Sequence, residues 1–176
     1  MTPFRTMRSA EAFRVSLAAP DDFEGWRDTA RRLIQADVPP DRIVWDSPAD
    51  PSTDLFAQGE RRLPAPPADA PQPRASRDFL QYAKSAILHS DSKRFSLLYR
   101  LLWRLQANPR LMDDRADADV RGIDELARQV RRDIHKMRAF VRFRVIDEPD
   151  GERYVAWFEP EHHILRSNAA FFVRRF

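Results

Sequence analysis

The sequence predicts an α+β fold: a helical core with a small N-terminal strand-helix-strand unit and a C-terminal β-hairpin. Apolar residues recur at helical spacing between Ser76 and Met137, and they alternate at strand spacing near residue 15 and after residue 140. Residues 46–75 contain seven of the chain's 14 prolines, which favours an extended connection. We therefore divide the chain into an N-terminal unit (1–45), a Pro-rich linker (46–75) and a basic helical and β-hairpin domain (76–176).

The N-terminal unit is predicted to be a strand, a helix and a second strand. Apolar residues alternate with polar or small ones over 13–17, which is typical of a half-buried strand. Asp22 is a candidate N-cap for a helix over 23–34, and Pro39 ends that helix because proline has no N–H to donate. The short apolar run 43–45 then completes a parallel βαβ unit. No glycine-rich phosphate loop follows the first strand, so no nucleotide site is predicted here.

Three helices are expected after the linker. Ser76 is the candidate N-cap of the first, whose apolar stripe ends near Leu88. The second stripe, over 95–105, is apolar around most of the helix, which favours a central position. It ends at Asn108, before a proline. The third helix begins near an acidic N-terminus and keeps one apolar stripe over 117–137.

A β-hairpin is predicted directly after the third helix. Its first strand, over 141–145, has apolar residues on one face and Arg142 and Arg144 on the other. Residues 149–151 have the composition of a turn, and the return strand covers 154–158. A last helix is expected at the C-terminal end of the sequence.

That last helix, predicted from Ser167 to Phe176, ends in an apolar and basic run. Such an end has more apolar surface than a free terminus usually exposes. We therefore expect a truncated chain, or a split protein that docks on a partner there.

The composition excludes several classes of protein. A chain of 176 residues corresponds to one domain, or one domain with an appendage. The absence of cysteine excludes disulfides, a cysteine-ligated zinc site, a cysteine-held iron–sulfur cluster and a cysteine nucleophile within this chain. No apolar stretch approaches the roughly 20 residues of a membrane span. The N-terminal residues lack the apolar core of a secretory signal. We expect a soluble, cytoplasmic protein with no membrane partner and no cofactor.

Positive charge is concentrated in the C-terminal part. Residues 1–75 contain 10 Lys or Arg and 12 Asp or Glu, whereas residues 76–176 contain 20 and 15. Only three of the 30 basic residues are lysines. Arginine makes bidentate contacts with phosphate, so this bias favours a nucleic-acid partner.

The densest basic run is VRRDIHKMRAFVRFR, over 130–144. Apolar residues at regular spacing within it indicate a folded surface, and a folded basic surface usually has an anionic partner. Phe140, Tyr154 and Trp157 are candidates for stacking on bases. The predicted nucleic-acid-binding residues are Arg128, Arg131, Arg132, Lys136, Arg138, Arg142 and Arg144. The alternative is that several of these arginines pair with acidic residues of the protein itself, namely Asp113, Asp114, Glu159 or Glu161.

A second candidate group consists of His135, Glu161, His162 and His163. Carboxylate and imidazole groups perform acid–base catalysis and bind zinc, iron or manganese. The spacing matches no established metal motif, however, and HExxH is absent. We therefore favour a loop of hydrogen-bonded histidines, with no metal site and no assigned catalytic residue.

Four segments of the chain carry a resemblance to a known family. They are FEGWRDTARRLIQADVPPDRIVW, RFSLLYRLLWRLQ, VRRDIHKMRAFVRFR and ERYVAWFEPEHHI. Together they resemble the uncharacterised domain of a probable DNA metabolism protein. That domain partners a putative DNA-repair radical-SAM protein, and it is fused N-terminally to UdgX-type uracil-DNA glycosylases. The resemblance covers most of the chain from Phe13 onward, apart from the Pro-rich stretch.

The resemblance implies a role in DNA repair or modification, with a uracil-DNA glycosylase domain or a radical-SAM repair protein as partner. It provides no catalytic residues. This chain lacks the cysteines of the fused glycosylase's iron–sulfur cluster, so that enzyme is absent from it. Three hypotheses result: an accessory DNA-binding module, a nucleic-acid-processing enzyme using the histidine group, or a protein-docking module for a repair enzyme.

Overall fold

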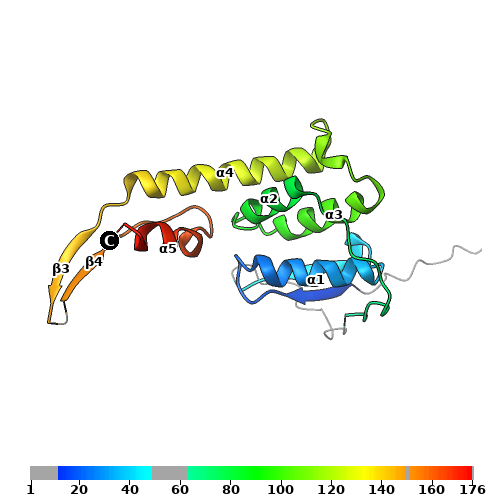
Figure 1. Ribbon diagram of the computed structural model, residues 1–176, viewed down its shortest axis with the longest axis horizontal. Helices are drawn as coiled ribbons and strands as arrows, with labels where there is room; N and C mark the ends of the chain where they lie inside the picture. Colours follow the sequence, from blue (N-terminus) through cyan, green and yellow to red (C-terminus); the bar gives the residue numbers. More distant parts are fainter. Residues whose placement is uncertain (1–11, 49–62, 150, 176) are drawn as a thin grey trace, which may run out of the picture.

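The computed structural model describes residues 12–48, 63–149 and 151–175, and it confirms the α+β class. These residues form two small sheets and five α-helices (Figure 1). The elements are β1 (Phe13–Ser16), α1 (Phe23–Gln35), β2 (Ile43–Asp46), α2 (Arg77–Ala86), α3 (Arg94–Ala107), α4 (Ala118–Phe140), β3 (Arg144–Glu148), β4 (Gly151–Val155) and α5 (Leu165–Val173). Short 3-10 helices occupy Pro40–Arg42 and Leu111–Asp113.

The predicted βαβ unit is confirmed. Strands β1 and β2 pair in parallel with Phe13 opposite Ile43, and α1 connects them. The ring of Trp45, on β2, lies 6.2 Å from that of Trp26 on α1 and 5.9 Å from that of Tyr99 on α3. These aromatic contacts join the small sheet to the helices, so the unit is part of a larger packed body.

Two helices begin at the N-caps that the sequence predicts, and a third begins at an acidic residue expected near its N-terminus. The carboxylate of Asp22 accepts a hydrogen bond from the backbone N–H of Gly25, and the hydroxyl of Ser76 accepts one from Phe79. Asp117 caps α4 by accepting from the N–H groups of Asp119 and Val120. Each cap satisfies donors that a helix cannot pair internally.

One hydrophobic core crosses the expected domain boundary. It contains residues of β1, α1, β2, α2, α3 and α4 as far as Ala127. The described part of the Pro-rich stretch lies against this body, since Leu63 packs on the core. The side-chain amide of Gln106 also accepts a hydrogen bond from the backbone N–H of Arg74 and donates one to its carbonyl. We call this part of the molecule, through Ala127, the N-terminal body.

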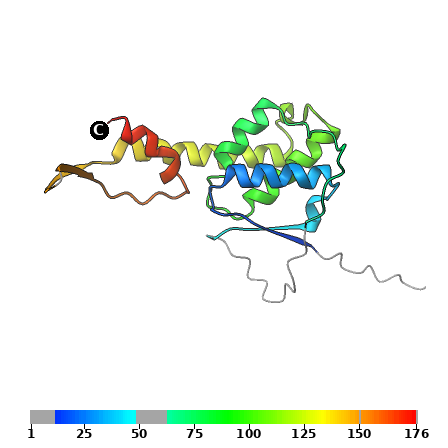
Figure 2. The same cartoon turned by 60° about the horizontal axis from the view of Figure 1, so that its bottom comes forward.

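Helix α4 extends well beyond the N-terminal body (Figures 1 and 2). Its 23 residues span about 35 Å. The second half of α4, the β3–β4 hairpin and α5 form a C-terminal body at the far end of the molecule. A small core of Val130, Met137 and Ile164 holds this body together, with Phe158 and Phe172 packed against it.

The boundary between helix and hairpin differs from the prediction. Helix α4 continues to Phe140 and β3 begins at Arg144, so the strand expected at 141–145 is mostly irregular. The reason is packing: Val141 contacts the small core next to Met137, and its N–H still bonds the carbonyl of Met137. Burial of the apolar stripe of α4 against α5 therefore keeps the chain helical for one more turn.

Two further boundaries also shift. Strand β4 covers 151–155 and not 154–158, and α5 begins at Leu165 and ends at Val173. Gly151 has a φ of +126°, a backbone conformation that glycine adopts without strain, as expected in the hairpin turn. Asp150, the middle residue of the predicted turn, lies outside the described residues. Among the helices described, none is both long and apolar enough to cross a membrane.

Candidate nucleic-acid interface

Five of the seven predicted basic residues fall into two groups along α4 and its C-terminal end, and Arg132 and Arg144 belong to neither group. The first group has acidic partners on the protein. Arg128 lies 2.6 Å from Asp124, one helical turn earlier, and Arg131 lies 3.9 Å from the same carboxylate. Lys136 reaches across to Glu161 at 2.8 Å. These pairs reduce the positive potential over the middle of the helix.

The second group lines a pocket in the C-terminal body. The pocket has a volume of about 460 Å³ and lies where the end of α4, the hairpin and α5 meet. We call it the arginine pocket. Its lining residues are Arg138, Ala139, Val141, Arg142, Phe143, Val145, Tyr154, Phe172 and Arg175. Three arginines and three aromatic rings therefore face one space.

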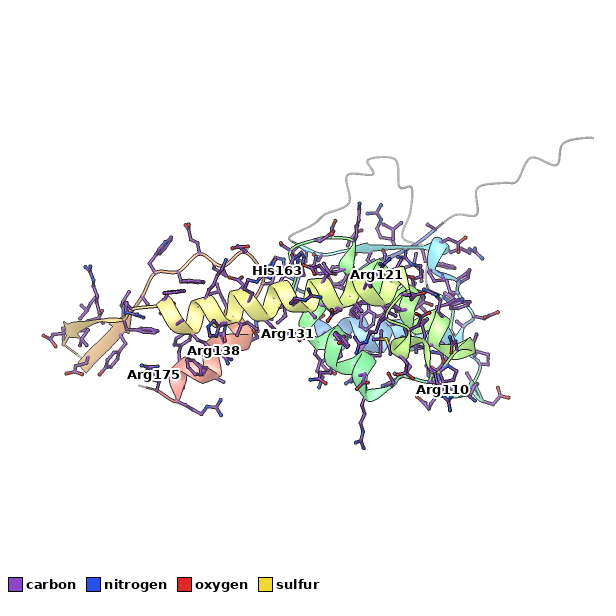
Figure 3. The ribbon with its side chains drawn as sticks, turned by 90° about the horizontal axis from the view of Figure 1, so that it is seen from above. Arg110, Arg121, Arg131, Arg138, His163 and Arg175 are labelled. Atoms are coloured by element: carbon purple, nitrogen blue, oxygen red, sulfur yellow. The ribbon has the colours of Figure 1, made fainter. Side chains whose placement is uncertain are left out.

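Arg138 is held in place by α5. Its Nε donates to the Oδ1 of Asn168 at 2.8 Å, and its guanidinium carbon lies 4.6 Å from the centre of the Phe171 ring. Asn168 is fully buried, and its amide also contacts the sulfur of Met137. Figure 3 shows Arg138 between α4 and α5. Because these contacts occupy Nε and one face of the guanidinium, its position is restricted.

Arg142 is held by the end of α4. Its Nη1 donates to the carbonyls of Ala139 and Val141 at 2.8 and 3.0 Å. These bonds satisfy carbonyl groups at the helix C-terminus, where a cation is also favoured by the helix dipole. Arg175, at the end of α5 nearer the hairpin, supplies the third charge (Figure 3).

No carboxylate among the described residues forms an ion pair with Arg138, Arg142, Arg144 or Arg175. The ion pairs of the described residues lie instead within the N-terminal body, along α4, between Lys136 of α4 and Glu161, at the hairpin tip, and between Arg166 at the start of α5 and Asp21 of the N-terminal body. The C-terminal end of α4 is therefore the part of the predicted basic surface whose charge is least compensated.

The hairpin register separates Arg144 from the pocket. Val145 lies opposite Tyr154, so both side chains project from the same face, and both line the pocket. Arg144 lies opposite Val155 on the other face. Arg142 precedes β3 and lies in the pocket. The expectation that Arg142 and Arg144 share one strand face is therefore wrong.

The three aromatic candidates have different positions. Tyr154 lines the pocket and is 41% exposed. Phe140 and Trp157 are more exposed, at 68% and 84%, but neither lines the pocket. Sequence reasoning missed Phe143 and Phe172, whose rings lie 5.4 Å apart, and it missed Arg175. The apolar and basic C-terminal run was a signal for the last two residues, but not for their position in a pocket.

The histidines occupy a different place, where the two bodies meet. The rings of His89 and His162 stack at 4.1 Å between centres. His162 Nδ1 lies 3.1 Å from the Oγ of Ser90, and the backbone N–H of His162 donates to the buried carboxylate of Asp133 at 3.0 Å. We call these four residues the histidine junction. His163, labelled in Figure 3, extends it by donating its backbone N–H to the carbonyl of Leu88.

The electrostatics of the histidine junction fit a structural role. The pKa of His162 lies below its usual 6.5, first because burial disfavours the cation and next because of His89, while Asp133 opposes the shift. Lys136 lowers the pKa of Glu161 by donating a hydrogen bond to its carboxylate. His135 is exposed on α4, apart from this cluster. Within the described part of the chain, no three acidic or histidine side chains form a metal-binding group.

One comparison with known proteins found a match, and it lies in the C-terminal half of the chain. Residues 92–176 match the family model DUF4130, a domain of unknown function. The DUF4130 match begins just before α3 and includes every residue that lines the arginine pocket. It covers a little under half of the chain. No curated protein and no solved structure matches the chain.

Proposed function

We propose that this chain is an accessory nucleic-acid-binding module of a DNA repair or modification system. Its C-terminal body contacts phosphate through Arg138, Arg142 and Arg175. The supporting observation is the arginine pocket: three guanidinium groups converge there, without a carboxylate of the described residues paired to them.

Phosphate binding follows from the chemistry of these groups. Guanidinium groups bind phosphate oxygens in a bidentate manner and stay charged at all physiological pH values. Neutralising phosphates releases condensed counterions, so affinity falls as salt rises. Two of the three arginines are restricted by their own protein contacts, which lowers the entropy lost on binding.

The test is fluorescence anisotropy with single-stranded, duplex and uracil-containing DNA, at low and near-physiological salt. The variant Arg142→Gln/Arg175→Gln removes two positive charges from the pocket. The matched control, Arg110→Gln/Arg121→Gln, removes two charges from exposed positions on the N-terminal body (Figure 3).

The pocket variant is expected to bind more weakly and with a smaller salt dependence. The slope of log affinity against log salt should decrease by about 0.7 to 0.9 for each phosphate that the variant no longer neutralises. The control should lose little affinity. Equal losses in both variants would indicate binding through net charge alone and would contradict the proposal.

The repair context rests on the resemblance of the four sequence segments. It identifies a radical-SAM repair protein or a uracil-DNA glycosylase domain as the partner to test. Co-purification of this chain with each candidate, in the presence of a nuclease, distinguishes a direct complex from two proteins bound to the same DNA.

A second candidate function is protein docking through the hairpin. Ile146 and Val155 are exposed apolar side chains on one face of the hairpin, and Trp157, two residues after Val155, is also exposed. If this candidate is correct, Trp157→Ala will weaken partner binding while DNA binding stays unchanged. The enzyme hypothesis has less support, because His135 is exposed on α4 whereas His162 is buried against His89.

A further inference from the structure

We propose that the histidine junction is an acid-sensitive latch between the N-terminal and C-terminal bodies. The latch is closed while His89 and His162 are both neutral, and it opens when either ring takes up a proton. It works without nucleic acid, so it goes beyond the proposed function. Its consequence is that acid changes the position of the C-terminal body, with the arginine pocket, relative to the N-terminal body.

The junction joins segments of both bodies. His89 and Ser90 follow α2 in the N-terminal body, whereas His162 precedes α5 in the C-terminal body. Next to them, the backbone N–H of His163 donates to the carbonyl of Leu88 at 2.8 Å, and the Leu88 side chain packs against both hydrophobic cores. An open latch leaves α4 as the connection between the bodies, and long helices bend.

A buried arginine builds the N-terminal side of this contact. The guanidinium of Arg94 donates to the carbonyls of Asp91 and Pro20, which belong to two separate loops. Asp21, next to Pro20, accepts a hydrogen bond from Arg166 of α5 at 3.1 Å. Arg94 therefore fixes both loops on which the C-terminal body rests, and the moving part is the histidine contact between them.

The hydrogen bonds of the junction require neutral rings. The backbone N–H of Ser90 donates to Nδ1 of His162 at 3.3 Å, and the backbone N–H of Asp91 donates to Nδ1 of His89 at 2.9 Å. A backbone N–H only donates, so each Nδ1 must present a lone pair. Nε2 of His89 then carries the hydrogen and donates to Oε1 of Gln129 at 2.7 Å. An imidazolium has no lone pair, so neither ring can be a cation in this arrangement.

Protonation disrupts the junction in two ways. A proton on Nδ1 of either ring faces a backbone donor, so that hydrogen bond is lost. It also places a positive charge against the other ring, whose centre is 4.1 Å away. Both His89 and His162 are buried, and burial disfavours a cation. Opening the latch returns the charged ring to water.

The charged neighbours leave His162 neutral at physiological pH. Burial lowers the pKa of His162 most, and a positive charge on His89 lowers it next. Asp133 and Glu161 raise this pKa, and His163 lowers it, but the result stays below the usual 6.5. The other charged groups around the junction are Arg94 on α3, Asp91 in the loop before it, and Arg132 and Lys136 on α4, which face Glu161.

The experiment measures the distance between the two bodies in the full chain. The chain has no cysteine, so Ala107→Cys on α3 and Ala169→Cys on α5 introduce two unique, exposed sites for spin labels. Double electron–electron resonance should give a narrow distance distribution at about pH 7.5 and a broader one at about pH 5.0, reversibly. Amide hydrogen exchange should show that α3 and α5 stay protected at the lower pH, which distinguishes opening from unfolding.

Three variants, each in the labelled chain, test the role of the rings. His89→Asn/His162→Asn retains an acceptor oxygen in place of each Nδ1 but cannot take up a proton, so the distribution should stay narrow at both pH values. His162→Ala removes the acceptor and the ring, and the distribution should be broad at both. The control His135→Asn removes an exposed histidine of α4 and should respond to pH like the wild type.

Three results would overturn the latch. The first is an unchanged wild-type distance distribution at a pH where NMR shows that the His162 ring is protonated. The second is a pH response that persists in His89→Asn/His162→Asn. The third is a simultaneous loss of protection in α3 and α5, which would identify acid unfolding of the whole chain. None of these results affects the test of phosphate binding, which is made at one pH.

Discussion

The carboxylate of Asp133 accepts a hydrogen bond from the backbone N–H of His162 at 3.0 Å, although the two residues lie 29 positions apart. Asp133 is buried in α4, and His162 belongs to the loop that leads into α5. This bond fixes the loop against the middle of α4. It therefore determines where α5, and with it Arg175, lies relative to the end of α4.

Asp133→Ala should destabilise the protein by about 1 to 3 kcal/mol, because it leaves the buried N–H of His162 without its acceptor. Asp133→Asn retains one carbonyl oxygen at that position and should cost less. Urea unfolding followed by circular dichroism measures both. Asp124→Ala, which removes a partly exposed partner of Arg128, should cost no more than about 1 kcal/mol.

Stability should fall on mild acidification because of His162. Its pKa is lower in the folded protein than the usual 6.5, so the unfolded chain takes up a proton more readily. The stabilisation is complete above about pH 6.5, decreases as the pH falls toward the folded-state pKa, and changes no further below it. His89, His163, Asp133 and Glu161 are the titratable neighbours that set this pKa.

This dependence is tested by measuring the midpoint of urea unfolding at several pH values between about 7.5 and 5.5. His162→Asn should flatten the profile, because it removes the titrating ring. The exposed His135→Asn should keep the wild-type profile. A wild-type profile that persists in His162→Asn would show that another group causes the acid sensitivity.

Arg94 should be among the residues least tolerant of substitution. It is fully buried, and its guanidinium donates to the carbonyls of Ile87, Asp91 and Pro20. Arg94→Met leaves these three acceptors unpaired, so we expect a loss of about 3 kcal/mol or more in the free energy of unfolding.

Denaturant unfolding also provides the control for Arg94. Arg100→Met breaks an exposed bidentate pair with Asp119 and should cost less than about 1 kcal/mol. If the two substitutions cost the same, the buried carbonyl contacts of Arg94 contribute little to stability.

Gly151→Ala should loosen the hairpin and, through it, the pocket. A side chain at a φ of +126° costs about 1 to 3 kcal/mol of backbone strain, although the space around it is open. Amide hydrogen exchange should become faster over β3 and β4 while α2 and α3 keep their protection. Affinity for single-stranded DNA should fall even though the protein's charge is unchanged.

The sequence predicts the elements of this fold well because their signals are local. Asp22 and Ser76 are N-caps in the sequence and in the structure, and the acidic N-terminus expected for the third helix contains its cap, Asp117. Helix α1 ends at Gln35, before the predicted stop at Pro39 and just before Asp37, which has a φ of +53°. Residues 141–145 were ambiguous. The alternation of apolar and basic residues fits a strand. In the structure, however, Val141 packs against the small core, so the helix is longer and is followed by irregular backbone before β3. That contact depends on residues about 20 positions away.

The ion pairs show a similar division. Asp124 lies four residues before Arg128, the spacing at which helix side chains meet, so this pair was visible in the sequence. The partners considered there were Asp113, Asp114, Glu159 and Glu161. Of these, Glu161 does bind a predicted basic residue, Lys136, which required the fold to bring them together. Arg175 reaches the pocket only because α5 folds back along α4.

The unbroken path of α4 through both hydrophobic clusters also has a consequence for insertions and deletions. Ala127 belongs to the core of the N-terminal body, and Met137 belongs to the core of the C-terminal body. Each residue added between them would rotate one cluster by about 100° relative to the other, since an α-helix has 3.6 residues per turn. The number of residues in this short interval thus sets the direction in which the whole far end of the molecule faces.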